Sequence, residues 1–300
     1  MRVVITGAAG FVGLNLLESL KDSEFDIIPC DIVDIKDVPI PFTKLDITNA
    51  DSVKKVVKGS DIIVHLAAHQ LMSSFSDILQ NAQVNIMGTL NLLEAARLYD
   101  LKKFIFTSAS SIVGVTKYNP VDEKHPCTPK TPYGVAKLAV EHYLRIYQEN
   151  YGLDYLIFRF FNIYGPYQTT GLIPTIYKRL ITNSPIDVYG NGSQVRDYVY
   201  IKDAMQFFRK AITENIKNDV VNIGTGTGTT VLEVINMASE ILKIKPQLNF
   251  HPAGEGEIDN FVANVELLRN LFGSVPNTSV KEGLKKTFNW LSSQEKQITT

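Results

Sequence analysis

A tyrosine and a lysine stand four residues apart, at Tyr133 and Lys137, in the run Tyr-Gly-Val-Ala-Lys. On a helix this spacing places both side chains on one face. A lysine ammonium beside a phenol favours the phenolate, so we expect the pKa of Tyr133 to fall below its usual value of about 10. A phenol tuned in this way accepts or donates a proton near neutral pH. The pair therefore predicts an acid–base group.

A glycine-rich segment near the N-terminus follows the first apolar run and precedes a helical pattern. Glycines permit a tight turn and the close approach of a pyrophosphate, whose charge the helix N-terminus attracts. The spacing is Gly-x-x-Gly-x-x-Gly instead of Gly-x-Gly-x-x-Gly, so the segment alone also fits an ordinary strand–helix turn. The residues predicted to hold a dinucleotide here are Gly7, Gly10, Phe11, Val12 and Gly13.

An acidic residue, Asp31, ends the second predicted strand, 21 residues after Gly10. A carboxylate at this place can accept hydrogen bonds from the ribose hydroxyls of adenosine, and it repels a 2′-phosphate. No arginine follows at once, so NAD is favoured over NADP. The alternative is an ordinary exposed turn residue.

Short apolar runs alternate with helical patterns in the first half of the chain. This alternation is typical of a parallel sheet covered on both faces, an α/β doubly wound fold of the Rossmann type. The predicted strands are Arg2–Thr6, Asp26–Cys30, Phe42–Leu45, Asp61–Leu66, Lys103–Ser108 and Tyr155–Phe158, and the predicted helices are Phe11–Lys21, Asp51–Val57, Val84–Tyr99 and Tyr133–Tyr151.

Prolines and glycines punctuate shorter elements after about residue 166. We therefore expect a dinucleotide-binding domain over 1–166, with return segments near 195–225, and a smaller interleaved lobe over 167–300. A strand at Val220–Ile223 is predicted to rejoin the first sheet. The helices predicted for this half are Lys202–Thr213, Val231–Leu242, Val265–Leu271 and Val280–Leu291.

The composition excludes several classes of protein. The 30 Lys and Arg residues balance 31 Asp and Glu residues, which argues against a nucleic-acid or membrane-surface partner. Two cysteines, Cys30 and Cys127, provide neither a disulfide framework nor a metal-binding spacing. No apolar run is long enough to span a membrane, and no signal-peptide pattern opens the chain. We expect a cytoplasmic protein without a bound metal.

These motifs, in their order, resemble the extended short-chain dehydrogenase/reductases, and specifically the NAD-dependent nucleotide-sugar epimerase/dehydratase group. The resemblance covers nearly the whole chain. The motifs that carry it are the glycine loop, Asp31, Asp46-Ile47, His65-Leu66-Ala67-Ala68, Asn85, the Tyr133/Lys137 pair, Arg159–Pro166 and Arg196–Val199.

The resemblance implies a role for each matching residue. Tyr133 resembles the catalytic acid–base group, Lys137 resembles the residue that holds the nicotinamide ribose, and Asn85 resembles the residue that stabilises a helix kink. The further positions implied to contact NAD are Asp46, Ile47, Leu66, Ala67, Ala68, Ser108 and Phe161. The positions implied to bind a nucleotide sugar are His69, Asn162, Leu172, Val188, Tyr189 and Arg196.

Several of these residues have a plainer interpretation. Tyr133 and Lys137 also fit an exposed helix face. Arg196 and Asp197 could form a surface ion pair, and Asn162 could form a turn before Gly165-Pro166. His65 reads better as a satisfied residue at a strand end than as a base.

The chain departs from the family at Ala109. Members usually have Ser or Thr five residues before the glycine that is here Gly114, and its hydroxyl donates to the substrate oxygen that gains or loses a proton. Loss of one such donor commonly costs a few kcal/mol of transition-state stabilisation. Ser108 and Ser110 lie next to this position, and we expect Ser110 to act in its place.

The residues of this turn also distinguish the dehydratases, decarboxylases and epimerases of the family. Dehydratases usually carry Asp-Glu after the catalytic Thr, and decarboxylases a Glu, whereas this turn reads Ala109-Ser110-Ser111. Epimerisation at C4 needs a hydride acceptor, a proton-shuttling tyrosine and rotation of a 4-keto sugar. The sequence therefore predicts an NAD-dependent epimerase of a UDP-hexose. The family resemblance implies a homodimer through the helices after Asn81 and from Tyr133. The alternatives are a 4-ketosugar reductase and a catalytically reduced NAD-binding or regulatory relative.

Overall fold

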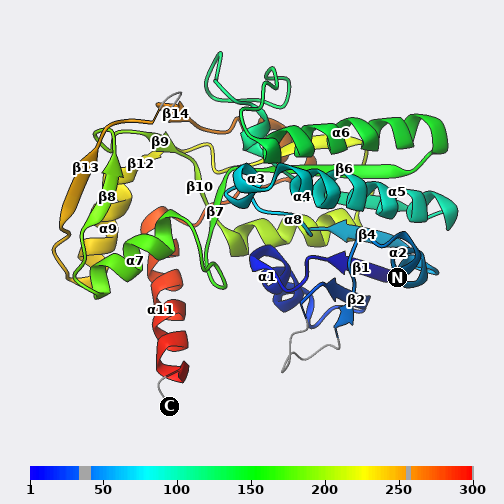
Figure 1. The fold of residues 1–300 in the computed structure, drawn as a ribbon, viewed down its shortest axis with the longest axis horizontal. Helices are drawn as coiled ribbons and strands as arrows, with labels where there is room; N and C mark the ends of the chain where they lie inside the picture. Colours follow the sequence, from blue (N-terminus) through cyan, green and yellow to red (C-terminus); the bar gives the residue numbers. More distant parts are fainter. Residues whose placement is uncertain (34–41, 255–257, 299–300) are drawn as a thin grey trace. The chain divides into compact units, whose positions relative to one another are not determined.

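The computed structural model describes residues 1–33, 42–254 and 258–298 (Figure 1). The chain forms two compact units, and each is built from separate stretches of sequence. Unit 1 comprises Met1–Gly114, Glu123–Phe160 and Met205–Asn222, and unit 2 comprises Val115–Asp122, Phe161–Ala204 and Ile223–Thr300.

Unit 1 is built on a seven-stranded sheet with the order β11-β6-β5-β4-β1-β2-β3. The chain runs outward from β1 to β3 and then returns to β4 on the other side of β1. Ligands of such sheets bind at the carboxyl ends of the strands where this reversal occurs. The predicted Rossmann-type α/β fold is thus confirmed, with strands β1 (Arg2–Thr6), β2 (Asp26–Asp31), β3 (Thr43–Lys44), β4 (Ile62–His65), β5 (Lys103–Ala109), β6 (Asp154–Phe160) and β11 (Asp219–Ile223).

Helices cover both faces of this sheet, because alternate strand residues point to opposite sides. Ile157 of β6 belongs to an apolar core that also contains residues of α2 (Ala50–Val57), α5 (Thr89–Leu98) and α6 (Pro132–Tyr151). Its neighbour Phe158 packs edge-on against Phe208 of α8 (Ile201–Thr213), with ring centroids 5.0 Å apart. The remaining long helix of unit 1 is α1 (Phe11–Leu20).

The single α-helix predicted over Val84–Tyr99 is wrong at its start, because residues 84–88 belong to a π-helical turn, η1 (Gln83–Gly88), and α5 begins at Thr89. Two short helices that were not predicted, α3 (Ser73–Ser76) and α4 (Ile78–Ala82), precede this turn. A Cβ at Gly88 would lie 2.7 Å from Ile47 Cδ1, so this turn packs directly on the segment after β3. The side chain of Asn85, described below, ties the same turn to His69.

Helix α6 has a well-defined start, and this fixes the position of Tyr133 in its first turn. Thr131 caps the helix, since its Oγ1 accepts a hydrogen bond from Gly134 N at 2.9 Å, and Pro132 occupies the first helical position. The helix ends at Gly152, which adopts the left-handed conformation with φ 71°. A short 3₁₀ turn, η2 (Ser110–Ile112), follows β5 and packs against α6.

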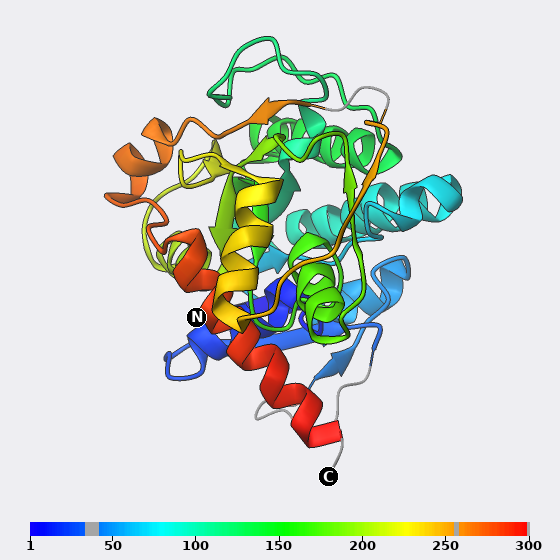
Figure 2. The same cartoon turned by 90° about the vertical axis from the view of Figure 1, so that its left-hand side faces the viewer.

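Unit 2 consists of small sheets and helices around its own core (Figure 2). The sheets pair β7 (Asn162–Tyr164) with β10 (Tyr198–Tyr200), β8 (Ile186–Tyr189) with β13 (Leu248–His251), and β9 (Val195–Arg196) with β12 (Thr229–Thr230) and β14 (Asn260–Phe261). The helices are α7 (Leu172–Ile181), α9 (Val231–Leu242), α10 (Glu266–Phe272) and α11 (Val280–Ile298).

The helices predicted for the second half lie within one residue of α8, α9 and α10, and α11 continues seven residues past the predicted end. Val220–Ile223 forms most of β11, so this strand rejoins the first sheet as predicted.

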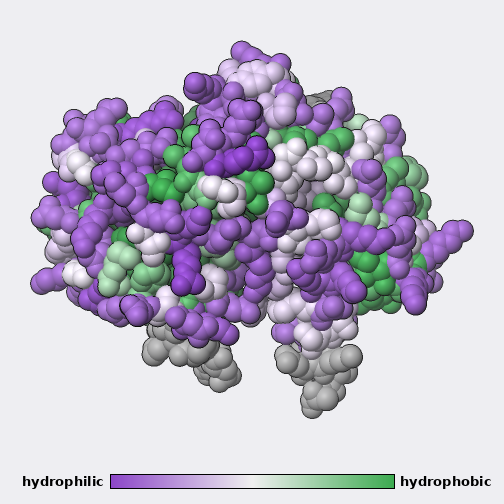
Figure 3. All heavy atoms as spheres, turned by 180° about the vertical axis from the view of Figure 1, so that it is seen from behind, coloured by the Kyte–Doolittle hydropathy of each residue, from purple (hydrophilic) through white to green (hydrophobic). Residues whose placement is uncertain are grey.

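The surface agrees with the balanced composition. Figure 3 shows hydrophilic side chains over most of one face, with apolar atoms in scattered patches between them. Within the described residues, every helix is too short or too polar to cross a membrane.

Candidate active site

The glycine loop lies at the carboxyl end of β1, against the end of β4. Gly7 has a left-handed φ of +70°, and a Cβ there would lie 2.4 Å from Ala67 N. A Cβ at Gly13 would lie 2.4 Å from Gly7 O. Neither position can accept a side chain without moving backbone. The loop is therefore held close to the strand end that contains Leu66, Ala67 and Ala68, all partly exposed.

The first turn of α1 has no side-chain cap, because its N-cap residue is Gly10. Unpartnered N–H groups and the helix dipole make such a terminus an anion site. Asp31, at the end of β2, reaches the same loop, where its Oδ2 accepts a hydrogen bond from Ala9 N at 2.9 Å. The carboxylate is thus beside the loop that it was predicted to serve.

The other residues predicted to contact NAD differ in exposure. Asp46 is exposed, and its Oδ1 accepts hydrogen bonds from both Thr48 N and Thr48 Oγ1. Ile47 is buried against Gly88. Asn85 accepts a hydrogen bond from His69 N at 2.7 Å and donates one to His69 O at 3.0 Å, which holds the segment after β4 against the π-helical turn.

Tyr133 and Lys137 lie on one face of α6, as their spacing predicted. Lys137 is buried, with its Nζ 5.4 Å from the centroid of the Tyr133 ring and 4.5 Å from that of Phe106. Its Nζ donates a hydrogen bond to Thr107 O at 2.8 Å. Because one face of the pair is fixed to β5 in this way, the interpretation as an exposed helix face is wrong.

The predicted fall in the pKa of Tyr133 is also wrong. Burial raises the pKa of Tyr133 to about 12, and burial lowers the pKa of Lys137 to about 7. The loss of water therefore outweighs the attraction between ammonium and phenolate that the spacing suggested. The structure thus places a neutral phenol beside a lysine whose pKa is close to neutral pH.

The lowered pKa of Lys137 has a consequence for stability. Its usual value is 10.5, so between about pH 7 and pH 10 the unfolded chain binds more protons at this position than the folded chain. The free energy of unfolding therefore gains a term that rises with pH across this window. We expect the unfolding free energy of the wild-type protein minus that of Lys137→Met to increase from pH 7 to pH 9, measured by urea unfolding without NAD. An equal difference at both pH values would contradict the assigned pKa.

The turn that carries Ala109 contains three serines. Ala109 ends β5 and is partly exposed, and Ser110 begins η2. The hydroxyl oxygens of Ser108 and Ser111 are buried and have no hydrogen-bond partner among the residues that the structure describes. Ser111 lies close to the first turn of α6, since a Cβ at Gly134 would be 2.8 Å from Ser111 O. Gly134, the residue after Tyr133, therefore lies against the turn where the missing hydroxyl is expected.

A buried ion pair one turn beyond Lys137 was not predicted. Glu141 of α6 receives two hydrogen bonds from Arg159 of β6, at 3.0 Å from Nε to Oε1 and 2.7 Å from Nη2 to Oε2. Arg159 also donates from Nη1 to Glu123 O at 2.9 Å. The carboxylate of Glu141 opposes the effect of burial on Lys137, because its charge raises the pKa of that lysine. The sequence signal that could have found Glu141 is its position four residues after Lys137, which places both side chains on one face of the helix.

The predicted sugar-binding residues other than His69 belong to unit 2. Asn162 has a buried Nδ2 that finds no hydrogen-bond partner within the described part of the chain, while Arg196 donates from Nη1 to Ile258 O at 2.6 Å. Val188 points its side chain into the core, and the adjacent Tyr189 is exposed and stacks on His251 with centroids 5.2 Å apart. The remaining predicted sugar-binding position is Leu172, which packs on the core of unit 2. Phe161, which was predicted to contact NAD, also belongs to unit 2 and stacks on Phe261.

Asp197 is a structural residue, so its interpretation as part of a surface ion pair is wrong. The side chain is fully buried. Its carboxylate accepts hydrogen bonds from Thr225 N and Oγ1, Gly226 N and Ala263 N. These bonds hold the turn after β11 against the end of β14.

The chain belongs to the NAD dependent epimerase/dehydratase family, whose model matches residues 3–224. It is 31% identical to a putative UDP-glucose 4-epimerase of Methanocaldococcus jannaschii, over 98% of this chain and 99% of that protein.

Two solved structures are similar over nearly the whole chain. The UDP-glucose 4-epimerase of Thermotoga maritima with UDP-glucose has 29% identity and a TM-score of 0.92, over 98% of this chain and 100% of that one. The UDP-glucuronic acid 4-epimerase of Bacillus cereus, in complex with UDP-glucuronic acid and NAD, has 30% identity and a TM-score of 0.89 over the same shares.

The residues present fit the NAD on which this family depends. The glycines let the loop lie against backbone that a Cβ at Gly7 or Gly13 would strike, the first turn of α1 is uncapped, and Asp31 supplies a carboxylate at the loop. When bound, NAD supplies a hydride acceptor and donor and a cationic ring that favours a nearby phenolate.

Proposed function

We propose that the chain is a nucleotide-sugar epimerase that inverts C4 of a UDP-hexose through a 4-keto intermediate. Tyr133 takes the proton from the C4 hydroxyl and returns it after the keto sugar has turned. Lys137 holds the nicotinamide ribose and, when charged, favours the phenolate of Tyr133. The observation that carries the proposal is the Tyr133–Lys137 face of α6, fixed to β5 through Thr107 O.

The turn after β5 favours epimerisation over the other reactions of the family. It reads Ala109-Ser110-Ser111, and no carboxylate stands there to remove a proton and water from the sugar. Epimerisation needs no such group, because the hydride and the proton both return to the substrate. The similarity to 4-epimerases over nearly the full chain supports the same choice.

Two assays test the proposal against its alternatives. The protein is incubated with UDP-glucose, UDP-galactose, their N-acetyl forms and UDP-glucuronic acid, without added reductant. We expect one pair to interconvert with no net consumption of cofactor. A 4-ketosugar reductase would consume NAD(P)H in proportion to product. A catalytically reduced relative, which Ala109 makes a specific alternative, would bind NAD but interconvert no pair.

We propose that Ser110 supplies the hydroxyl that Ala109 lacks. Ser110→Ala should then lower turnover about 10²-fold, the usual effect of losing one donor to a reacting oxygen. Ser111→Ala is the matched control, and Ala109→Ser should raise turnover. If Ser110→Ala has the activity of the wild type, or if only Ser111→Ala loses activity, the assignment to Ser110 is wrong.

We propose that the residues of unit 2 predicted to bind a nucleotide sugar contact the substrate; the role of His69, in unit 1, stays a prediction. Arg196 suits a diphosphate because its guanidinium donates several hydrogen bonds in a fixed plane. The unpartnered Nδ2 of Asn162 is a further donor. Tyr189 offers an exposed ring for the base, whereas Val188 can contribute only its backbone. Leu172, at the first position of α7, completes this set.

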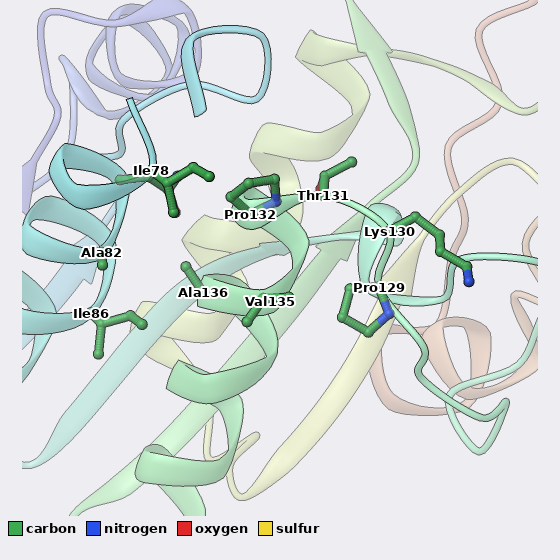
Figure 4. A pocket seen from close by; sticks show the side chains of 10 residues that line it. Ile78, Ala82, Ile86, Pro129, Lys130, Thr131, Pro132, Val135 and Ala136 are labelled. Atoms are coloured by element: carbon green, nitrogen blue, oxygen red, sulfur yellow. The ribbon is translucent and has the colours of Figure 1, made fainter. Parts of the chain in front are cut away.

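We also propose that two copies of the chain associate through α4, η1 and α6. A pocket of about 520 Å³ lies between these elements. Figure 4 shows Ile78 and Ile86 facing Pro132 and Val135 across it. Ile78 and Val135 are 59% and 52% exposed, an unusual state for apolar side chains that lie together, and a second copy would cover them.

Association can be measured by light scattering during size-exclusion chromatography. The wild-type protein should elute at twice 33.5 kDa, and the double variant Ile78→Asp/Val135→Asp should elute at 33.5 kDa, because two buried carboxylates oppose docking. Phe250→Asp, at a residue of unit 2 that is 55% exposed, is the control and should stay dimeric. A wild-type mass of one chain would contradict the proposal.

A further inference from the structure

His65, the last residue of β4, joins two elements through its ring although it is almost completely buried. Its Nδ1 lies 2.7 Å from Oγ1 of Thr6, at the end of β1. Its Nε2 lies 2.9 Å from Oγ1 of Thr89, the first residue of α5. Thr6 and Thr89 are 1% and 0% exposed, so water does not compete for these bonds. The ring thus connects the strand that enters the glycine loop to the helix that follows the π-helical turn.

The hydrogen bonds have one consistent direction. Thr89 donates its hydroxyl hydrogen to Asn85 O at 2.8 Å, so toward His65 its oxygen acts as the acceptor. Nε2 of His65 therefore carries the hydrogen. Burial, aided by the charge of Lys137, lowers the pKa of His65 well below its usual value, so the ring is neutral and Nδ1 accepts from Thr6.

We call the hydrogen-bonded residues Thr6, His65, Thr89 and Asn85 the relay. It ends at the segment after β4, through Asn85. The side chain of Asn85 binds both the N–H and the carbonyl of His69. The relay therefore runs without a break from the residue before Gly7 to the segment after β4. π-Helical turns such as η1 are rare and occur often at functional sites.

The ring of His65 also contacts Phe106, the aromatic ring that packs against Lys137. It stacks on Phe106 with centroids 5.7 Å apart and meets Phe104 edge-on at 5.8 Å. Phe106 is the ring that lies 4.5 Å from Lys137 Nζ. Displacement of His65 would therefore disturb both the glycine-loop strand and the packing under Lys137.

We propose that His65 is a positioning residue, and that its relay sets the glycine loop and η1 in the arrangement that binds NAD. A buried imidazole that loses one partner leaves an unsatisfied polar atom, so each link depends on the others. The proposal rests on the dependence of this family on NAD and not on which sugar is turned over. NAD binding tests it separately from the proposed epimerisation.

The test is a double-mutant cycle on the two threonines, Thr6→Val and Thr89→Val, which keep the side-chain shape and remove one hydroxyl each. NAD affinity is measured by calorimetry on protein stripped of NAD. We expect each single variant to raise Kd about tenfold, the effect of about one buried hydrogen bond. The Kd of the double variant for NAD should be no more than about twofold higher than that of either single variant. The loss of one hydrogen bond already interrupts the relay, so the loss of the second adds little.

Hydrogen exchange supplies a second measurement that does not depend on binding. In Thr6→Val, amides of residues 83–89 should exchange faster than in the wild type, although Thr6 lies on another element. His65→Gln, which can both donate and accept, should recover part of the NAD affinity that His65→Leu loses.

Thr287→Val is the matched control. Thr287 is also fully buried and also donates to the carbonyl four residues earlier, Gly283 O at 2.7 Å, but it takes no part in the relay. It should leave the Kd for NAD unchanged. Two results would overturn the proposal. In the first, Thr6→Val and Thr89→Val behave like Thr287→Val, with lower stability and a Kd within twofold of the wild type. In the second, the effects of the two valines on Kd multiply in the double variant, and exchange at 83–89 does not change.

Discussion

Tyr133→Phe should lower turnover of the nucleotide sugar about 10²- to 10⁴-fold, the usual contribution of a positioned acid–base group. The variant loses only the hydroxyl, so the ring still packs on α6 near Lys137 Nζ, 5.4 Å from the ring centroid. In the proposed mechanism, Tyr133 is the residue that takes the proton of the C4 hydroxyl. The measurement is the initial rate of epimerisation at saturating substrate, together with the Kd for NAD, which should change little.

Tyr143→Phe is the control for this variant. Tyr143 lies on the same helix and packs against the core of unit 1. Its hydroxyl has no part in the proposed chemistry, so full activity is expected. If Tyr133→Phe kept more than a tenth of the wild-type rate, another group would have to be the acid–base residue, and the mechanism would be wrong.

The second large effect is on stability, at the ion pair of Arg159 and Glu141. Their side chains are 4% and 1% exposed, and their two hydrogen bonds tie β6 to α6. Arg159→Met leaves the carboxylate buried without its partner, which should cost about 3–5 kcal/mol of unfolding free energy. The double variant Arg159→Met/Glu141→Leu removes both charges, and it should recover most of this loss.

The matched control is an exposed pair on another helix. Lys286 and Glu282 of α11 are 48% and 56% exposed, so Glu282→Gln should change the unfolding free energy by less than about 1 kcal/mol. Urea unfolding of the NAD-free protein measures all three variants. A double variant as unstable as Arg159→Met alone would show that the loss comes from packing and not from the unpaired charge.

Much of the fold could be predicted from the sequence because its pattern is local. Strand β1, the glycine loop and α1 follow from apolar spacing and glycine placement, and α9 occupies its predicted residues. The break before α5 could not be predicted in the same way. It depends on bonds between Asn85 and His69 and on the contact between Gly88 and Ile47, which join residues far apart in the chain.

The candidate site shows the same division between local and distant causes. The four-residue spacing was enough to place Tyr133 and Lys137 on one face of α6. Their pKa values were not predictable from it, because burial by surrounding strands decides them. Arg159 was visible only as part of a motif, and its partner Glu141 became apparent once β6 and α6 were packed together.

The most direct test of the account follows the hydrogen at C4. UDP-glucose and UDP-galactose carrying deuterium at C4 are incubated with the protein in ordinary water, without added reductant, and the products are examined by NMR spectroscopy; UDP-glucuronic acid and the N-acetyl forms are treated in the same way. If Tyr133 exchanges only the hydroxyl proton while the C4 hydride is removed and returned, the C4 epimer should appear with its deuterium in place. No epimer from any of these sugars, or an epimer whose C4 deuterium has been replaced by solvent hydrogen, would contradict the proposed reaction.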